Sequence, residues 1–318
     1  MRAMVIPAFG GPEVFELREV PHPVPGPGQV LVRVVAAGTN PVDAKIRAAG
    51  EWARVVPPAI LGYDVSGVIE EVGPGVRDFA PGDEVFYTPE IFGNQFGSYA
   101  ELTVAAASIV AKKPSRLSHV EAAAVPLAGG TAWEALVRRL RLRVGETVLI
   151  HGGAGGVGSF AVQIAKAAGA RVLATAGAEN QDVLRALGAD RPIDYTREDA
   201  ADVAVSETHG AGVDAVFDTV GGELIAQSLR ATRSGGRLAT VLNPRGDLSA
   251  LYTRNLTLHG VFLTREAARL QEMTPLLESG EVTPLVDGVL DLKDVAEAHR
   301  RLDTGHGRGK LILSVAKA

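Results

Sequence analysis

The hydrophobic positions of this chain follow two patterns, and one gives way to the other near Glu121. Before that residue, short apolar runs such as 30–38 and 65–73 are separated by glycine and proline. Runs of this kind, rich in valine and bounded by turn residues, predict short β-strands. After it, apolar runs alternate with stretches whose apolar residues recur at helical spacing. That alternation predicts an α/β fold with a doubly wound parallel sheet, joined to a β-rich region.

The α/β region divides into a series of predicted elements. Strands are predicted at 148–150, 171–175, 215–218, 237–241 and 257–262, and a last strand at 310–315. Helices are predicted at 131–140, 160–168, 180–187, 266–279 and 292–302. With 318 residues the chain is long for one hydrophobic core, so we expect two domains, with the chain ends returning to the first.

A glycine-rich turn joins the strand at 148–150 to the helix that follows. Gly153, Gly155 and Gly158 lie there in G-x-G-x-x-G register. In this context the first glycine permits the turn, the second lets the backbone approach a pyrophosphate, and the third lets helix and strand pack closely. The free N–H groups and the positive end of the helix dipole then attract an anion. The turn therefore predicts a dinucleotide site, with a purely structural turn as the alternative.

The end of the next strand bears on which dinucleotide binds. A site that prefers NAD usually has a carboxylate there, which hydrogen-bonds the ribose 2′-hydroxyl. Here the strand ends in Thr175 and Ala176, so no acid repels a 2′-phosphate, and Thr175 is able to donate a hydrogen bond to one. This favours NADPH. Glu179 follows closely, however. A shift of two residues in the loop would bring its carboxylate to the ribose and favour NADH. The alternative is that Glu179 caps the helix at 180–187.

Composition and charge narrow the range of functions. Cysteine is absent, which excludes disulfides, thiolate metal sites and a cysteine nucleophile. The 32 basic and 37 acidic residues give a net charge of −5, so the chain offers no electrostatic attraction for nucleic acid or an anionic membrane. The first residues lack an apolar signal core, and no uncharged run is long enough to span a bilayer. We expect a cytoplasmic protein that binds neither nucleic acid nor membrane.

Several short motifs occur in a specific order along the chain. They lie at 37–43, 61–67, 82–86, 97–101, 129–133 and 217–222, with the glycine turn between the last two. Together they resemble the medium-chain dehydrogenase/reductase superfamily, and specifically its zinc-independent quinone oxidoreductase branch, over essentially the whole chain. The resemblance implies a GroES-like β domain built from residues 1–122 and 265–318, with a Rossmann domain inserted at 123–264.

The resemblance also shows where this chain departs from the zinc-dependent relatives. In those proteins a cysteine and a histidine bind the catalytic zinc at the positions of Asn40 and Tyr63. Zinc needs three or four nitrogen, sulfur or carboxylate ligands, and the seven histidines show no close metal spacing. We therefore expect no metal site. Alcohol oxidation without a Lewis acid is disfavoured, whereas conjugate reduction by a nicotinamide cofactor needs only a hydrogen-bond donor at the carbonyl oxygen.

Three residues are candidates for that chemistry. Asn40 is the first candidate donor, because its amide carries two N–H groups; the alternative is a side chain that satisfies the Asn-Pro turn. Asp43 either orients Asn40 or closes a local turn, and Tyr63 either donates a proton or packs in the interior. The predicted activity is an NADPH-dependent, metal-free reduction of quinones or α,β-unsaturated carbonyls, with small apolar substrates. The alternatives are an enoyl-thioester reductase and a non-catalytic NADPH-binding or sensor protein.

The resemblance implies further cofactor contacts, residue by residue. Thr131 would face the nicotinamide, and Tyr195 would contact the 2′-phosphate unless it only ends a strand. The remaining implied contacts are Gly153, Ala154, Gly155, Gly156, Val157 and Gly158 at the pyrophosphate, and Ala176, Val220, Asn243 and Phe262 at strand ends. Arg308 and Lys310 either reach phosphate or lie in a solvated loop. Relatives are commonly dimers or tetramers that pair through an edge strand, which would be 257–262 here.

Overall fold

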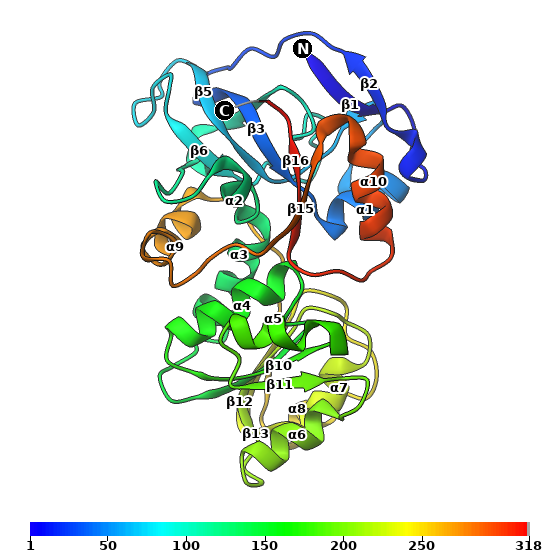
Figure 1. Cartoon of the computed structure of the whole chain (residues 1–318), viewed down its shortest axis with the longest axis vertical. Helices are drawn as coiled ribbons and strands as arrows, with labels where there is room; N and C mark the ends of the chain where they lie inside the picture. The colour runs from blue at the N-terminus through cyan, green and yellow to red at the C-terminus, as the bar shows by residue number, and fades with distance from the viewer. Residues whose placement is uncertain (317–318) are drawn as a thin grey trace. The chain divides into compact units, whose positions relative to one another are not determined.

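Two compact units make up the computed structural model, which describes residues 1–316 (Figure 1). Unit 1 contains Met1–Leu127, Thr264–Ser279 and the chain from Pro284 onward. Unit 2 contains Ala128–Leu263 and Gly280–Thr283. Both ends of the chain thus belong to unit 1. The predicted domain boundaries fall at 122/123 and 264/265, whereas the units separate at 127/128 and 263/264.

Unit 1 is built on a seven-stranded sheet with the order β15-β16-β3-β5-β6-β8, in which β7 also pairs with β3. Its strands are β3 Gln29–Gly38, β5 Val65–Val72, β6 Glu84–Tyr87, β7 Leu102–Ala106, β8 Ala111–Lys112, β15 Val286–Asp291 and β16 Lys310–Ser314. A second sheet has the order β2-β1-β4, with β1 Arg2–Ile6, β2 Glu16–Glu19 and β4 Ala59–Ile60. The valine-rich β3 is buried along nearly its whole length, as expected for a strand that is covered on both faces.

Helices cover this sheet and connect its strands. They are α1 Pro41–Ala49, α2 His119–Ala123, α9 Ala267–Ser279 and α10 Val295–Asp303, with the short turns η1 Pro12–Val14, η2 Glu51–Ala53, η3 Ala107–Ile109 and η7 Leu292–Asp294. α2 packs on β3 and β5, and α10 packs against α1. A bilayer span needs about 20 apolar residues. α9 is only 13 residues long in total, and none of the helices in residues 1–316 combines the length and the hydrophobicity of a transmembrane segment.

The last strand, β16, brings a distant part of the chain beside the start of α1. β16 runs antiparallel to β3. Thr39, just after β3, donates from both its backbone nitrogen and its hydroxyl to the carbonyl oxygen of Leu311, each at 3.0 Å. Lys310, at the start of β16, is therefore placed next to Asn40, the residue that precedes α1.

Unit 2 contains one parallel sheet with the order β11-β10-β9-β12-β13-β14. Its strands are β9 Thr147–His151, β10 Arg171–Ala176, β11 Arg191–Asp194, β12 Val213–Asp218, β13 Thr232–Thr240 and β14 Thr257–Gly260. Counted within the unit, this is the 3-2-1-4-5-6 order of a Rossmann fold. The strand order reverses between β9 and β12, and ligands of open α/β sheets bind at the carboxyl ends of the strands at this point.

The helices of unit 2 differ slightly from the predicted ranges. They are α4 Gly156–Ala167, α5 Gln181–Ala186, α6 Ala200–Glu207, α7 Leu224–Ser228 and α8 Ala250–Thr253, with the turns η5 Ala178–Asn180 and η6 Leu229–Ala231. The helix predicted at 131–140 begins earlier, as α3 Pro126–Trp133, and continues as the π-helix η4 Glu134–Arg139. Its start fits the preference of proline for the first helical position, where no N–H is needed.

Each unit has its own hydrophobic core. In unit 1, completely buried side chains such as Val32, Ile46 and Tyr99 join the strands to α1. In unit 2, Leu149 and Val216 belong to a cluster contributed by neighbouring strands of the parallel sheet and the helices over it. The candidate sites therefore stand on two separately packed scaffolds.

Candidate active site

Asn40 lies at the start of α1 and is buried, with 2% of its surface exposed. Its Nδ2 donates to Asp64 Oδ2 at 2.9 Å, and its Oδ1 accepts a hydrogen bond from Lys310 Nζ. Lys310 Nζ also lies 3.0 Å from Asp64 Oδ2. We call Asn40, Asp64 and Lys310 the Asn40 cluster. It joins an amide to a buried pair of opposite charges.

Lys310 is fully hydrogen-bonded within this cluster. Its ammonium donates to the Thr39 carbonyl at 2.8 Å, to Asn40 Oδ1 and to Asp64 Oδ2. An ammonium has three hydrogens, so each of them has an acceptor. The other oxygen of Asp64 accepts from the Leu127 backbone nitrogen at 2.7 Å. The side chains of Lys310 and Asp64 are 4% and 0% exposed, and charges so deeply buried are tolerated only when they are paired.

The two charged neighbours fix the orientation of the Asn40 amide. A lysine ammonium only donates, so the atom of Asn40 that faces Lys310 is the oxygen. The amide nitrogen then faces the Asp64 carboxylate, which only accepts. This bond uses one of the two amide hydrogens, and no acceptor for the second is found among residues 1–316.

Asp43 closes the first turn of α1. Its Oδ2 accepts from the backbone nitrogen of Asn40 at 2.8 Å and from the Tyr99 hydroxyl at 2.7 Å. The side chain is completely buried, and burial raises the pKa of this carboxyl to about 7, although the bond from Tyr99 acts to lower it. Its Oδ1 has no hydrogen-bond partner in the described chain. Asp43 thus bonds the backbone of Asn40 and not its amide group, which favours the turn-closing interpretation.

Tyr63 directly precedes Asp64 and is completely buried. Its hydroxyl, like Asp43 Oδ1, makes no hydrogen bond within the part of the chain that the structure describes. Burial and the nearby Asp43 carboxylate raise the pKa of this hydroxyl, while the Arg265 guanidinium acts to lower it. Packing accounts for the buried ring. It does not account for the hydroxyl, because an unpaired polar atom in the interior costs free energy unless a ligand or water satisfies it.

The donor set around Asn40 does not fit a catalytic zinc ion. The resemblance implies that Asn40 and Tyr63 occupy the positions of a cysteine and a histidine in zinc-dependent relatives. Lys310 already donates to the Asn40 oxygen and to Asp64, and its charge opposes a second cation at the same oxygens. Within residues 1–316, no three histidine, cysteine, aspartate or glutamate side chains are grouped as metal ligands.

The glycine turn follows β9 in unit 2, and its glycines have distinct environments. Gly152 has a φ of 73°, so the left-handed residue of the turn precedes the expected Gly153. A Cβ on Gly158 would lie 2.0 Å from Gly152 O, and no other residue fits there. A Cβ on Gly155, the N-cap of α4, would meet only Gly152 O at 3.3 Å, so the helix start is open. The same segment contains Ala154, Gly156 and Val157. Tight packing at the third glycine and an open helix start fit a dinucleotide pyrophosphate.

The residues expected at the adenosine ribose lie together at the ends of β10 and β11. Tyr195 follows β11, is 55% exposed, and donates from its backbone nitrogen to Ala176 O at 3.4 Å. Thr175 is buried, and its hydroxyl accepts from the Gly152 nitrogen at 3.1 Å. Thr175 thus stabilises the glycine turn from the neighbouring strand, whereas the ring of Tyr195 is accessible to a ligand.

Glu179 lies close to the end of β10. It is exposed and belongs to the turn η5. Its carboxylate folds back to within 2.7 Å of the point that a Cβ on Gly177 would occupy, and it accepts from Asn180 Nδ2 at 3.1 Å. No side-chain capping bond is formed at the start of α5. Glu179 is therefore an acid beside the strand end.

The other expected cofactor contacts follow strands of the sheet or lie on α3. Val220 comes after β12 and is exposed, and its Cγ2 lies 2.8 Å from the point that a Cβ on Gly152 would occupy. Asn243 comes after β13 and Phe262 after β14, and both are exposed. Thr131 lies on α3 and is buried. The structure thus brings Val220 to the glycine turn.

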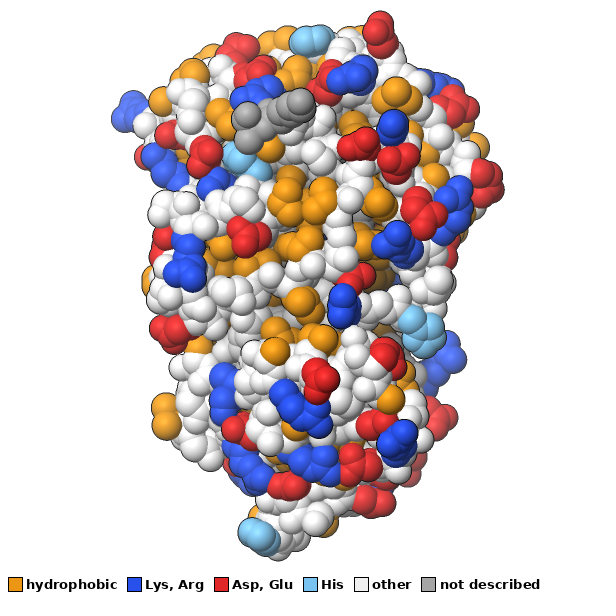
Figure 2. Space-filling view, in the orientation of Figure 1, with side chains coloured by type: hydrophobic (Ala, Val, Ile, Leu, Met, Phe, Trp, Pro, Cys, Tyr) orange, Lys and Arg blue, Asp and Glu red, His pale blue; other side chains and the backbone are white. Residues whose placement is uncertain are grey.

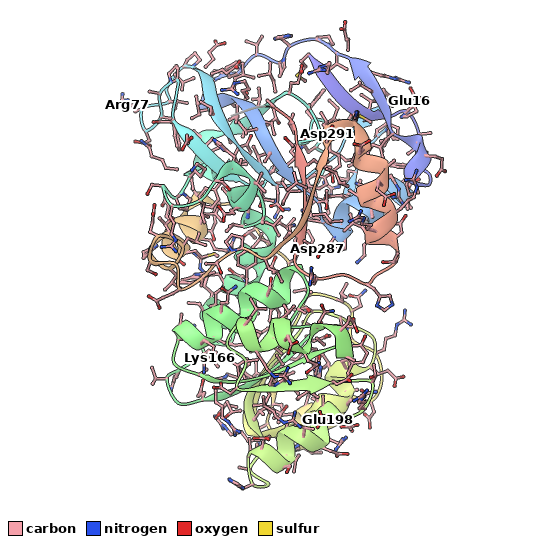
Figure 3. All side chains as sticks on the ribbon, viewed as in Figure 1. Glu16, Arg77, Lys166, Glu198, Asp287 and Asp291 are labelled. Atoms are coloured by element: carbon pink, nitrogen blue, oxygen red, sulfur yellow. The ribbon has the colours of Figure 1, made fainter. Side chains whose placement is uncertain are left out.

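Lys310 and Asp64, the charged members of the Asn40 cluster, were not among the predicted site residues. Lys310 is neither in a solvated loop nor accessible to a phosphate, because it is buried and fully bonded. Arg308 instead pairs with Asp287, which is labelled in Figure 3. The distance from Arg308 Nε to Asp287 Oδ1 is 2.7 Å. A signal was present: Lys310 opens an apolar strand, and Asp64 lies in an otherwise uncharged segment. A buried charge of one sign implies a partner of the other sign.

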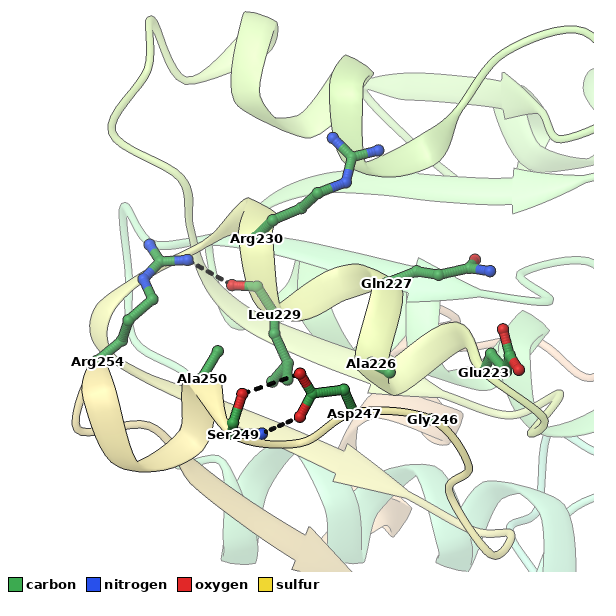
Figure 4. A pocket seen from close by; sticks show the side chains of 10 residues that line it. All are labelled: Glu223, Ala226, Gln227, Leu229, Arg230, Gly246, Asp247, Ser249, Ala250 and Arg254. Atoms are coloured by element: carbon green, nitrogen blue, oxygen red, sulfur yellow. Dashed lines mark hydrogen bonds between the residues drawn. The ribbon is translucent and has the colours of Figure 1, made fainter.

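Unit 2 also has an open hollow of about 420 Å³ beside α7 and α8 (Figure 4). It is lined by Glu223, Ala226, Gln227, Leu229, Arg230, Gly246, Asp247, Ser249, Ala250 and Arg254. Two of its charged residues are already bonded within the protein: Arg254 donates to Leu229 O at 2.5 Å, and Asp247 accepts from Ser249 N at 2.8 Å. None of the expected cofactor contacts lines it, and we assign it no role.

Positive and negative side chains are interspersed on the face shown in Figure 2. Lys166 and Asp190 illustrate the pattern, as an exposed pair 2.8 Å apart. An enoyl-thioester reductase would need a basic entrance for the phosphates of its carrier. This face offers no such concentration of positive charge.

Comparison with known proteins agrees with the fold. A family model described as "Zinc-binding dehydrogenase" matches residues 187–313, and one described as "Alcohol dehydrogenase GroES-like domain" matches residues 26–115. The chloroplastic NADPH-dependent alkenal/one oxidoreductase of Arabidopsis thaliana is 36% identical over 98% of this chain and 79% of its own length. The quinone oxidoreductase of Homo sapiens is 35% identical over 98% of this chain and 97% of its own.

A solved structure described as an NAD-dependent alcohol dehydrogenase has a TM-score of 0.93 to this chain. It is 37% identical over 99% of this chain and 100% of its own. The chain belongs to the medium-chain dehydrogenase/reductase superfamily. The predicted fold class, a GroES-like domain with an inserted Rossmann sheet, is confirmed. Within the superfamily, the chain is a member of the quinone oxidoreductase branch.

Proposed function

We propose that this protein is a metal-free, NADPH-dependent reductase that transfers hydride to quinones or α,β-unsaturated carbonyl compounds. Two relatives are named as an alkenal/one oxidoreductase and a quinone oxidoreductase, which supports this reaction class. The observation that carries the proposal is the Asn40 cluster. It presents an amide N–H, held between a buried ammonium and a buried carboxylate, where zinc-dependent relatives have metal ligands.

The Asn40 cluster suits a substrate oxygen that becomes negative during the reaction. The nicotinamide cofactor supplies the hydride. As a quinone or enone accepts it, negative charge develops on the carbonyl oxygen, and the second N–H of Asn40 binds this oxygen. Lys310 and Asp64 already hold the amide in place, so no reorganisation is needed at that moment. A preorganised donor in a buried site stabilises such charge more than water does.

NADPH is the proposed cofactor, and the carboxylate of Glu179 is expected to weaken the preference for NADPH over NADH. No acid lies within 174–178 at the end of β10, and the accessible Tyr195 stands at the end of the neighbouring strand. The Arabidopsis relative is named as NADPH-dependent. The carboxylate of Glu179 near Gly177 would repel a 2′-phosphate or accept a hydrogen bond from a 2′-hydroxyl. We therefore expect a modest preference for NADPH over NADH.

We further propose that the protein forms a homodimer or homotetramer through β14. This strand is the last in the parallel sheet and pairs with β13 along one edge. Its other edge carries backbone groups that a second copy of the strand would satisfy. Sedimentation equilibrium at micromolar concentration tests this proposal, and a monomer would contradict it.

The first test of the activity is a panel of acceptors with NADPH and with NADH. The acceptors are 1,4-benzoquinone, 9,10-phenanthrenequinone, 2-cyclohexenone and crotonyl-CoA, each with and without EDTA. We expect NADPH oxidation with a quinone or enone at a rate that EDTA leaves unchanged. Turnover with crotonyl-CoA alone would indicate an enoyl-thioester reductase. NADPH binding without turnover on any acceptor would contradict the proposed activity, and loss of activity in EDTA would contradict a metal-free reaction.

A further inference from the structure

The hydrogen bonds around Asp43 determine which of its oxygens carries a proton. Oδ2 accepts from the Asn40 backbone nitrogen at 2.8 Å and from the Tyr99 hydroxyl at 2.7 Å. A carboxylate oxygen that accepts two hydrogen bonds has both of its lone-pair directions in use. When Asp43 is protonated, its proton therefore lies on Oδ1. This atom is buried and makes no hydrogen bond with residues 1–316.

Tyr99 is held in turn by His299 and Arg47. Tyr99 Oη lies 3.2 Å from His299 Nε2, and Arg47 Nη1 lies 3.2 Å from His299 Nδ1. All three side chains are buried. Arg47 is itself anchored by the Gly10 carbonyl at 3.0 Å and by the Asp303 carboxylate at 2.9 Å. The array runs from Asp303, near the surface, to Asp43 in the interior.

The donors in this array point in one direction. The Arg47 guanidinium only donates, so His299 Nδ1 accepts and the proton of the neutral ring lies on Nε2. Nε2 then donates to the Tyr99 oxygen, and the Tyr99 hydrogen goes to Asp43. Burial and the charge of Arg47 lower the pKa of His299 to about 3, which keeps the ring neutral. The array thus fixes the orientation of the Asp43 carboxyl through Oδ2, and Oδ1 takes no part in these hydrogen bonds.

A second polar atom without a partner lies near Asp43. It is the hydroxyl of Tyr63, which is buried and makes no hydrogen bond in the described residues. The Asp43 carboxylate raises the pKa of Tyr63, so the two groups are within electrostatic range. Buried polar atoms in folded proteins nearly always have a partner. The Asp43 carboxyl is able to hold a proton, and the Tyr63 hydroxyl is able to relay one. Both lack a hydrogen-bond partner in the described residues, so a ligand or a water molecule would have to supply it.

We propose that Asp43 holds the proton consumed in each turnover and that Tyr63 delivers it to the substrate oxygen. This inference rests on the proposed reductase activity, in which each substrate takes up one hydride and one proton. The hydride bonds to substrate carbon, the cofactor is oxidised, and an electron pair moves onto the carbonyl oxygen. Tyr63 gives its proton to that oxygen. Because Asp43 Oδ1 and the Tyr63 hydroxyl make no direct hydrogen bond, the Oδ1 proton of Asp43 replaces it through a bridging water molecule. The Asp43 carboxylate then regains a proton from solvent. Tyr99, His299 and Arg47 are positioning residues.

This role of Asp43 predicts how activity depends on pH. Burial raises the pKa of Asp43 to about 7; Tyr99 and Lys310 act to lower it, and Asp64 acts to raise it. The nearby Tyr63 hydroxyl stays neutral, because its own pKa is raised. Below pH 7 the carboxyl is protonated and supplies the proton, and above pH 7 it is ionised and does not. We therefore expect kcat/KM to fall above about pH 7, by roughly tenfold per pH unit.

Asp43→Asn tests the proton-holding role directly. It keeps the shape of the side chain and removes the titrating proton. We expect kcat to fall by about 100-fold, the decline above pH 7 to disappear, and NADPH affinity to remain. Tyr63→Phe should lower kcat by a similar factor. An Asp43→Asn enzyme that keeps the wild-type decline with pH would overturn the proposal.

Tyr99→Phe tests the positioning role. It removes a hydrogen bond that lowers the Asp43 pKa, so the decline in kcat/KM should move to higher pH by about one unit. Tyr87→Phe is the matched control, because it removes the hydroxyl of another completely buried tyrosine of the same unit. Its profile should match that of the wild type. An unshifted profile for Tyr99→Phe would contradict the positioning role.

A measurement without turnover separates this inference from the proposed function. Infrared difference spectra of the wild type between pH 6 and pH 8 should show a protonated-carboxyl band that is lost at pH 8 and absent in Asp43→Asn. If the wild type reduces quinones or enones but lacks this band, the inference alone fails. If the band is present and no acceptor is reduced, the proposed function fails, and delivery by Tyr63 fails with it.

Discussion

The glycine turn and the Asn40 cluster are built in opposite ways. The glycine turn is one continuous segment between β9 and α4, and it presents backbone N–H groups. The Asn40 cluster joins side chains that are 24 and 270 residues apart in the chain. A site made of closely packed backbone is damaged by substitutions that add side-chain atoms. A site made of paired charges is damaged by substitutions that remove one of the charges. This difference predicts which substitutions damage each site.

The largest effect is expected when the charge pair of the Asn40 cluster is broken. Lys310→Met leaves the Asp64 carboxylate buried without its cation, and such a loss costs about 3–5 kcal/mol of folding free energy. Lys166→Met is the control, because Lys166 and Asp190 form a partly exposed pair worth about 1 kcal/mol or less. Urea denaturation of both variants measures the difference.

Two further results would show whether the charge pair holds the Asn40 cluster together. The double variant Lys310→Met/Asp64→Leu should regain part of the lost stability, because it no longer buries an unpaired charge. If Lys310→Met costs no more than Lys166→Met, the Asn40 cluster is not held together by its charges.

The next largest effect is expected on the chemical step. Asn40→Ala removes the proposed oxyanion donor, so kcat should fall by about 100-fold or more. NADPH affinity should be unchanged, since the glycine turn is untouched. Single-turnover kinetics measure the first quantity and fluorescence titration the second. A variant that loses affinity and kcat in equal proportion would show that Asn40 supports the structure and not the reaction.

The glycine turn should respond to single added methyl groups. Gly158→Ala places a Cβ 2.0 Å from Gly152 O, so it should cost about 1–3 kcal/mol of stability and also weaken NADPH binding. Gly155→Ala meets only one atom, at 3.3 Å, so it should leave the melting temperature within a few degrees while weakening NADPH binding by about tenfold. Wild-type affinity in Gly155→Ala would mean that the pyrophosphate does not approach this helix start.

The smallest effect is expected at Glu179. Removing its charge in Glu179→Gln should raise NADPH affinity a few-fold relative to NADH, because exposed charge interactions are worth about 1 kcal/mol or less. The gain should shrink at high salt, where exposed charges are screened. Asp182→Asn, at a nearby exposed acid that pairs with Arg185, serves as the control. Equal responses of the two variants would assign no specific role to Glu179.

Local patterns in the sequence account for the fold and for the glycine turn. The strand predicted at 171–175 is β10 Arg171–Ala176, and the helix predicted at 266–279 is α9 Ala267–Ser279. In both cases the period of the apolar residues determines the element, and that period is visible within one window of sequence. The register of the three glycines likewise lies within six residues.

The partners of Asn40 and Asp43 were not predictable in this way. Lys310 reaches Asn40 only because β16 pairs with β3, and a strand register between the two ends of the chain leaves no local signature. Tyr99 meets Asp43, and His299 meets Tyr99, through a tertiary fold that brings a loop and α10 beside α1. Side chains from separate elements form such networks, so motif spacing does not reveal them.

The position of β16 in the chain also affects the order in which the protein is made. Nearly all of unit 2 is the uninterrupted segment Ala128–Leu263, whereas unit 1 needs β16, which follows every other element. On the ribosome, the parallel sheet with its glycine turn is synthesised completely before Lys310 emerges. The glycine turn is thus complete in the nascent chain well before Lys310 is available to hold the Asn40 amide.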